Sequence, residues 1–299
     1  MERIDLTFPP EIWHIGNKDI ESMEQFLRVL QTKMDVPQPF GSFHLIAVFL
    51  VILCTVAVCA NHHNADEKTY RRVLVTIWTI MVVLEAIKQV IKSYSFTPEG
   101  EIVWAYCWDA FPLQLCDSPF YLLLPIAFLP NGRLRDALSA YMYTYVLLGG
   151  VSTFILISTT FTSTVYFNVH TLAHHGLQVI ACIFIAVRNR ERIAAHSFPD
   201  ALLVFLIAVS IATTFNVVMH LLVPDQVINM FFISPYFKKT MPILNEEWKN
   251  LHWIPTIMLY ISGVSLIAYS VFRLFKKVFH TAPQKEVAAA REKRRETSV

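Results

Sequence analysis

Residues 43–60 read FHLIAVFLVILCTVAVCA, a run without a single acidic or basic charge. About 20 apolar residues in a helix span the hydrocarbon core of a bilayer. Comparable runs recur at 71–92, 110–130, 135–158, 168–187, 200–223 and 252–275. Backbone groups in lipid must be satisfied within their own segment, so these runs predict helices. The expected fold is an all-α, polytopic membrane helix bundle with about seven transmembrane helices.

The composition supports the same class. Of 299 residues, 55% are hydrophobic and 16% are charged, and the mean hydropathy is +0.45. An ordinary soluble domain is less apolar. A membrane β-barrel would show short alternating segments, and the sequence has none. The net charge of +2 says little about partners, and no nucleic-acid partner is expected.

The charges between the apolar runs predict an orientation. With the N-terminus outside, sixteen Lys and Arg fall on the inner side and eight on the outer side. Cytoplasmic segments carry the excess of these residues, so the bias predicts N-out and C-in. Three regions follow: an extramembrane or interfacial segment at 1–42, the transmembrane bundle at 43–275, and a basic cytoplasmic tail at 276–299.

The stretch before the first span is amphipathic. In IESMEQFLRVLQTKM (20–34), Met23, Phe26, Leu27 and Leu30 share one helical face and charges occupy the other. This pattern predicts an interfacial helix on the outer leaflet, or a small helix packed on the loops. The long loop 224–251 is interpreted as a lid over a cavity or as a plain connector.

Polar residues in the third span, FPLQLCDSPFYLLLP (111–125), suggest a functional site, because such groups at bilayer depth are costly. Gln114 and Asp117 share a helical stripe, and Cys116 lies beside it. Prolines at 112, 119 and 125 predict a kink near Cys116. A packed polar interface between helices is the alternative interpretation.

Two later spans carry similar stripes. HTLAHHGLQV (170–179) places His170 and His174 on one face and His175 on the adjoining face, and Asn216 and His220 are four apart in the sixth span. Spans three, five and six are therefore predicted to line one polar cavity. In the second span, Glu85 and Lys88 are interpreted as a structural ion pair.

Several short motifs resemble a known family. FPLQLC (111–116) stands where the YwaF family of bacterial integral membrane proteins carries a signature close to Leu-Pro-Leu-His-Leu-Cys. The resemblance continues in FGSFHL (40–45), AHHGL (173–177) and INMFFISP (228–235), which contains Asn229. A distantly related eukaryotic membrane protein is an ether-phospholipid acyltransferase thought to use a cysteine and a histidine.

The resemblance implies a thiol–histidine site, with two departures from the pattern. Gln114 replaces the signature histidine, and Leu113 occupies the position of the eukaryotic cysteine, three residues before Cys116. The apolar run that follows matches His175 to the family histidine better than His174.

Three classes of function with a defined activity remain open from the sequence, beside a structural assembly partner with no chemistry of its own. The first is a lipid acyltransferase with Cys116, His175, His174 and Asp117 as catalytic residues. Its substrate would contact a further set of side chains: Gln114, Asn216, His220, His170 and Asn229. The second is a carrier, channel or receptor for a small molecule or ion. The third is a metal or haem protein using His170, His174, His220 and Asp117, which is less favoured because no second matching motif follows.

We therefore expect no cofactor and no metal. The expected partners are membrane lipids, with a phospholipid or lysophospholipid as the substrate. The expected location is the plasma membrane, which the chain crosses several times.

Overall fold

The computed structural model describes residues 17–98, 101–157, 160–193, 196–236 and 252–296, with side chains described for Ser22 and, within these ranges, from residue 24 to residue 279. Two short strands form an antiparallel hairpin, and nearly everything else in these residues is helical. The elements, in chain order, are α1 (Asn17–Leu30), α2 (Ser42–His62), α3 (Glu67–Ser93), β1 (Tyr94–Phe96), β2 (Ile102–Trp104), η2 (Trp108–Ala110), η3 (Leu115–Asp117), α4 (Ser118–Phe128), α5 (Arg133–Tyr141), the π-helical turn η4 (Met142–Val146), α6 (Leu147–Ile155), α7 (Val165–Arg188), α8 (Phe198–Leu222), η7 (Met230–Phe232) and α9 (Trp253–Glu296).

Six helical segments in the described residues are long and apolar enough to cross a membrane. They are α2, α3, the continuous run Arg133–Ile155, α7, α8 and the first part of α9. The all-α multi-pass bundle is thus confirmed. The count of seven transmembrane helices is not, because the third predicted span contains only the 11-residue helix α4. The N-out orientation stays a prediction.

The third predicted span, 110–130, is helical in its second half only. Pro119 lies in the first turn of α4, where its missing N–H and fixed φ are tolerated. Phe111, which precedes Pro112, is extended, as residues before a proline usually are, and Gln114 is extended as well. The helical chain therefore begins at Leu115 with the 3₁₀ turn η3, which runs directly into α4, and the predicted kink near Cys116 is the first turn of this helix rather than a bend within a longer one.

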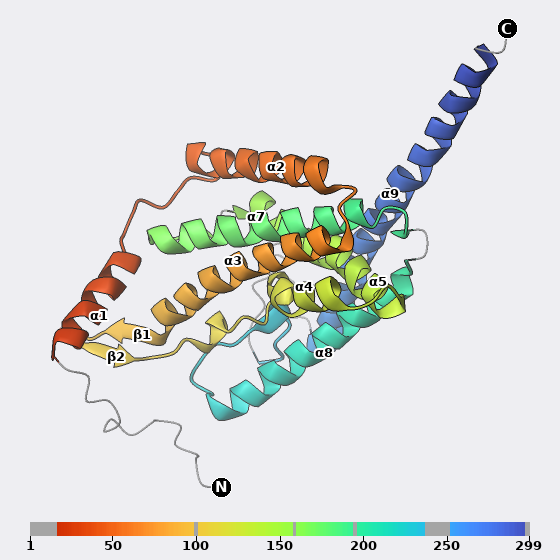
Figure 1. Cartoon of the computed structure of the whole chain (residues 1–299). Coiled ribbons are helices and arrows are strands. Elements are labelled where there is room, and N and C mark those ends of the chain that lie inside the picture. Colours follow the sequence, from red (N-terminus) through yellow and green to blue (C-terminus); the bar gives the residue numbers. More distant parts are fainter. Residues whose placement is uncertain (1–16, 99–100, 158–159, 194–195, 237–251, 297–299) are drawn as a thin grey trace.

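This segment nevertheless runs along the whole of α3 in the opposite direction. The Gln89 side chain donates to the carbonyl of Ala110, Trp78 donates to that of Phe120, and Arg71 donates to that of Ala127. The irregular chain at 111–117 thus lies inside the bundle, packed between helices (Figure 1).

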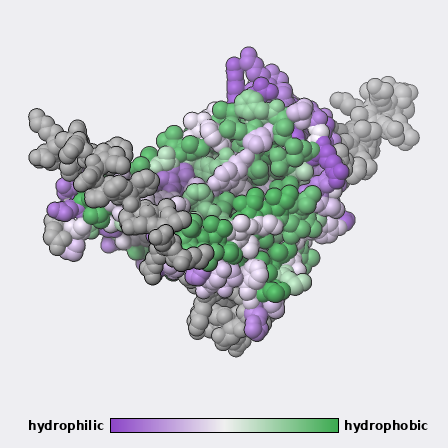
Figure 2. All heavy atoms as spheres, turned by 90° about the horizontal axis from the view of Figure 1, so that it is seen from below, coloured by the Kyte–Doolittle hydropathy of each residue, from purple (hydrophilic) through white to green (hydrophobic). Residues whose placement is uncertain are grey.

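The outside of the bundle is apolar. Helix α2 and the first part of α9 are the least buried of the six spans, and α2 carries large exposed side chains such as Phe49, Ile52 and Val56. Seen from below, apolar residues spread across the middle of the molecule while hydrophilic residues gather toward its ends (Figure 2). This arrangement is typical of a protein surrounded by lipid tails.

Helices α2 and α7 pack closely side by side (Figure 1). A Cβ added at Gly176 would lie 2.6 Å from Cγ2 of Val51, so only glycine allows this approach. Because Gly176 follows directly after His175, the contact fixes the histidine-bearing part of α7 against its neighbour.

The ends of the chain extend the bundle. The predicted N-terminal amphipathic helix is present as α1, with Leu27 buried and Phe26 exposed, and its interfacial position stays a prediction. Helix α9 continues through most of the predicted basic tail to Glu296. Most of the predicted lid, 237–251, lies outside the described residues.

Candidate functional site

The turn η3 presents a thiol and a carboxylate inside the bundle. The Oδ2 atom of Asp117 accepts a hydrogen bond of 2.7 Å from the backbone N–H of Gln114, which closes the turn. Asp117 is only 5% exposed and Cys116 is partly buried. Since one carboxylate oxygen is used by the turn, Oδ1 is left to face α7.

Helix α3 contributes an ion pair. Glu85 is 6% exposed, and its Oε1 atom lies 2.8 Å from Nζ of Lys88 and accepts a 2.6 Å hydrogen bond from Gln89. Tyr106 in turn donates to Gln89. The predicted pair is confirmed. Glu85 lies eight residues before the end of α3, about 12 Å along the helix at 1.5 Å per residue.

Helix α7 brings two histidines to these acids. Nε2 of His170 lies 3.3 Å from Oε2 of Glu85. Nε2 of His174 lies 3.1 Å from the backbone oxygen of Cys116 and 3.7 Å from Oδ1 of Asp117. The two rings stack at 5.5 Å, as expected for residues four apart on one helical face.

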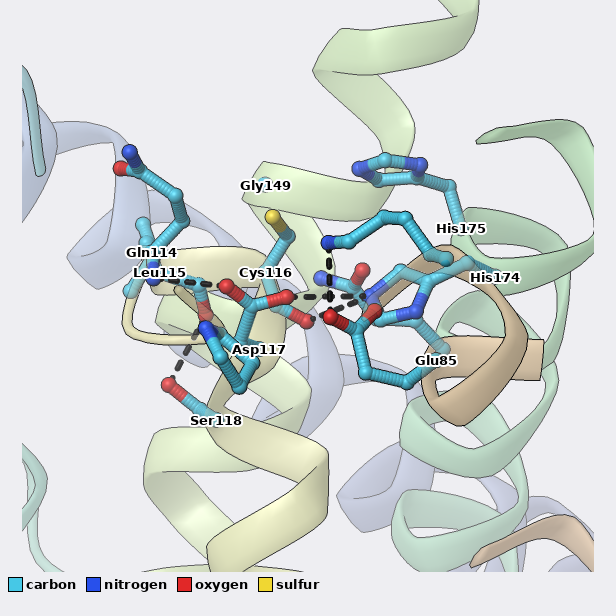
Figure 3. A network of polar contacts seen from close by, with 12 residues as sticks. Glu85, Gln114, Leu115, Cys116, Asp117, Ser118, Gly149, His174 and His175 are labelled. Carbon is cyan, nitrogen blue, oxygen red and sulfur yellow. Dashed lines mark hydrogen bonds and ion pairs between the residues drawn. The ribbon is translucent and has the colours of Figure 1, made fainter. Parts of the chain in front are cut away.

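His175 points to the neighbouring face of α7. Its Nδ1 atom lies 2.7 Å from the carbonyl oxygen of Thr171, and a carbonyl can only accept. Nδ1 therefore carries the hydrogen, and Nε2 of the neutral ring is an acceptor. The His175 ring lies 5.1 Å from that of His174, and Figure 3 shows it on the same side of the cluster as the Cys116 sulfur.

We call this group the acid–histidine centre. Its members are Glu85, Lys88, Cys116, Asp117, His170, His174 and His175. Figure 3 labels Glu85, Cys116, Asp117, His174 and His175. Two triplets within it bring one ligand atom of each residue to within 4.8 Å of the others: Glu85, His170 and His174, and Cys116, Asp117 and His174. The centre therefore offers a nucleophile, acid–base groups and metal-ligating atoms.

Three other predicted residues form a separate structure, which we call the amide clamp: Gln114, Asn216 and Asn229. The Asn216 side chain accepts from Met230 N–H at 2.8 Å and donates to Met230 C=O at 3.0 Å. Gln114 accepts from Phe231 N–H at 2.7 Å and donates to the Asn229 carbonyl at 3.2 Å. The Asn229 side chain accepts from Ser234 N–H.

The amide clamp holds a strained backbone. Phe231 has a φ of +56°, a conformation that bulky residues rarely adopt. Such strain costs about 1–3 kcal/mol and persists only where the surroundings fix it. The predicted cavity thus divides: spans three and five meet at the acid–histidine centre, and Asn216 of span six binds the 229–231 backbone instead.

The last predicted residue, His220, stacks on Tyr236 with ring centroids 3.8 Å apart. In contrast, Glu85 and Lys88 join the centre although the sequence indicated only a structural pair. The sequence could have indicated this role for Glu85 and Lys88, because ionisable residues at bilayer depth mark functional sites. Gln89 and Tyr106 gave no comparable signal.

Comparisons with known proteins identify the family and nothing finer. The model of the TMEM164 family matches residues 39–276, which is most of the chain and includes every member of the acid–histidine centre. No curated protein and no solved structure matches the chain. The resemblance to the YwaF family stays a prediction. This multi-pass membrane protein, with its buried cluster of acids and histidines, belongs to the TMEM164 family.

Proposed function

We propose that this protein transfers fatty acyl groups between membrane lipids, with Cys116 as the nucleophile. The observation that carries the proposal is the meeting of the Cys116 thiol with the His174 imidazole and the Asp117 carboxylate inside a lipid-facing bundle, with the His175 ring beside that of His174. The resemblance of the surrounding motifs to a family related to a membrane acyltransferase supports the same chemistry.

The first step forms a thioester. The Cys116 thiol loses its proton to a base, and the sulfur attacks the ester carbonyl of a phospholipid. The S–C bond forms, the ester C–O bond breaks, and the departing lysophospholipid oxygen takes the proton back from the base. In the second step, the hydroxyl of another lysophospholipid attacks the thioester, and the thiol is restored.

We assign the role of base to His175, because its ring lies on the same side of the cluster as the Cys116 sulfur in Figure 3, whereas Nε2 of His174 contacts the Cys116 carbonyl. The Nδ1–H of His175 is held by the Thr171 carbonyl, so Nε2 keeps a lone pair that can accept the thiol proton. Nε2 of His174 instead donates to the Cys116 carbonyl, and this hydrogen bond fixes the turn that bears the nucleophile. His174 is thus a positioning residue for Cys116.

The location of the thiol suits a lipid substrate. Cys116 precedes α4 by two residues, so the positive end of that helix dipole lies next to it, an environment in which reactive cysteines are found. We propose phospholipids and lysophospholipids as the substrates and the plasma membrane as the location. The apolar surface of the bundle would deliver lipids laterally from the bilayer.

The test is to look for the acyl-enzyme. Protein purified in phospholipid nanodiscs should carry a fatty acyl mass on the peptide containing Cys116, and neutral hydroxylamine should remove it. Cys116→Ala should lose the adduct. His175→Ala should form it about 100-fold or more slowly, the usual contribution of a general base. Cys54→Ala is the matched control, because Cys54 lies on the exposed face of α2.

Two results would contradict the proposal. An adduct that persists in Cys116→Ala would remove this thiol as the nucleophile. Wild-type protein that carries only bulk membrane lipid and no thioester would favour a carrier or receptor.

A further inference from the structure

We infer that Glu85, His170 and His174 form a binding site for a divalent transition-metal ion of the zinc type. The site uses one carboxylate and two imidazoles from two adjacent helices. Glu85 and His170 have no part in the proposed acyl transfer, and His174 enters it only through its contact with the Cys116 carbonyl. Metal binding therefore does not rest on the proposed function.

The distances fit an ion between the ligands. Two ligands bound to tetrahedral zinc at about 2.0–2.1 Å lie about 3.4 Å from each other. Oε2 of Glu85 and Nε2 of His170 are 3.3 Å apart, and one ligand atom of His174 lies within 4.8 Å of both partners. His170 and His174 are four residues apart on α7, which places both rings on one side of the site.

The key atoms are buried and incompletely bonded. Glu85, His170 and His174 are 6%, 7% and 2% exposed. Oε2 of Glu85 and Nε2 of His170 lack a hydrogen-bond partner of good geometry among the described residues, and so does Nδ1 of His174. Buried polar atoms normally have partners, so a missing ligand is a direct explanation for this concentration of exceptions.

Neighbouring groups hold the ligands in place. Lys88 and Gln89 both bind Oε1 of Glu85, which orients the carboxylate with Oε2 toward His170. Metal-binding carboxylates are commonly fixed by such partners. Either nitrogen of His174 could bind the ion: Nδ1 has no hydrogen-bond partner among the described residues, and Nε2 would have to give up its contact with the Cys116 carbonyl.

Asp117 supplies a further oxygen at the same place. Its Oδ1 atom lies 3.7 Å from Nε2 of His174, and the residue is 5% exposed. Two carboxylates therefore face one ammonium, that of Lys88, in this part of the described structure. Two imidazoles with carboxylate oxygens suit zinc and similar ions, whereas magnesium prefers oxygen ligands and water.

The test is a titration of the full chain in detergent after treatment with a chelator. Isothermal calorimetry with zinc chloride should show one ion bound per chain, and magnesium chloride should show none. His170→Ala should weaken zinc binding tenfold or more. His196→Ala is the matched control, because His196 is also a buried histidine beside a carboxylate, at the other end of the bundle. Cys116→Ala should bind zinc as the wild type does.

Two outcomes would overturn the inference without depending on the folding of a variant. One is wild-type protein that binds no zinc. The other is X-ray absorption at the zinc edge showing a shell dominated by sulfur, since the proposed shell contains imidazole nitrogen and carboxylate oxygen. Equal zinc affinity for His170→Ala and His196→Ala would also contradict the site.

Discussion

The acid–histidine centre and the amide clamp are two polar structures inside the bundle, and both take residues from the segment just before α4. In the clamp, neutral amides meet backbone groups, and both polar atoms of the Asn216 side chain are hydrogen-bonded. In the centre, charged and ionisable groups meet one another, and Oε2 of Glu85 and Nε2 of His170 are left without good partners.

The difference indicates what each structure does. A satisfied buried network fixes one backbone conformation, and the clamp fixes the positive φ of Phe231. A partly satisfied charged cluster adds little to stability, and its free atoms are available to a ligand or substrate. The clamp is therefore expected to determine folding, while the centre determines chemistry.

The largest effect on stability is expected from breaking the ion pair in the centre on one side only. Lys88→Met leaves the Glu85 carboxylate buried without its cation, which should destabilise the protein by about 3–5 kcal/mol. The double variant Glu85→Gln, Lys88→Met removes both charges and should recover most of this loss. Thermal unfolding in detergent measures both. A double variant as unstable as Lys88→Met would show that the centre stabilises the fold after all.

A somewhat smaller effect is expected in the clamp. Asn216→Leu leaves the N–H of Met230 buried and unpaired, at about 1–3 kcal/mol, while the Met230 carbonyl keeps its hydrogen bond from the N–H of Ile233. Ser210→Ala on the same helix is the control, because Ser210 is exposed and bonds only within α8. The free energy of unfolding should fall for Asn216→Leu, while zinc affinity should stay unchanged in any protein that folds. A large loss of zinc affinity in folded Asn216→Leu would mean that the amide clamp also holds the acid–histidine centre in place, which contradicts the separation of the two.

Much of this comparison was accessible from the sequence. The apolar runs predicted the membrane bundle, because hydropathy reports directly on burial in lipid. Helical periodicity placed His170 and His174 on one face, and the structure finds them stacked. The three-residue spacing of Glu85 and Lys88 predicted their pair.

The features that could not be predicted from the sequence depend on contacts between distant segments. Periodicity predicted a stripe through Gln114 and Asp117, but helical geometry begins only at Leu115 and Gln114 is extended, so the two side chains part. Gln114 turns to the 229–231 backbone and Asp117 to His174. No local pattern identifies the backbone of a loop more than a hundred residues away as the partner of an amide.

His196 lies at the opposite end of the bundle and shows what burial alone does to a histidine. It lies outside the spans, between α7 and α8, and is 2% exposed. Its Nδ1 atom is 3.1 Å from Tyr143 Oη, and its Nε2 atom is 3.3 Å from Asp136 Oδ1. Burial lowers the pKa of His196, and the nearby Asp136 carboxylate only partly opposes this.

The smallest effect is expected from His196, which should make the stability of the fold depend on pH. Because the folded pKa lies below the unfolded value of about 6.5, the unfolded chain binds a proton first as the pH falls. The contribution of neutral His196 is present above that value and is lost as the pH falls through the folded pKa. The melting temperature of the wild type should thus drop more between pH 7 and pH 5 than that of His196→Gln. Equal drops in melting temperature would mean that the Asp136 carboxylate fully compensates the effect of burial on His196. The number of nearby carboxylates, and not burial, would then be what distinguishes His196 from the histidines of the acid–histidine centre.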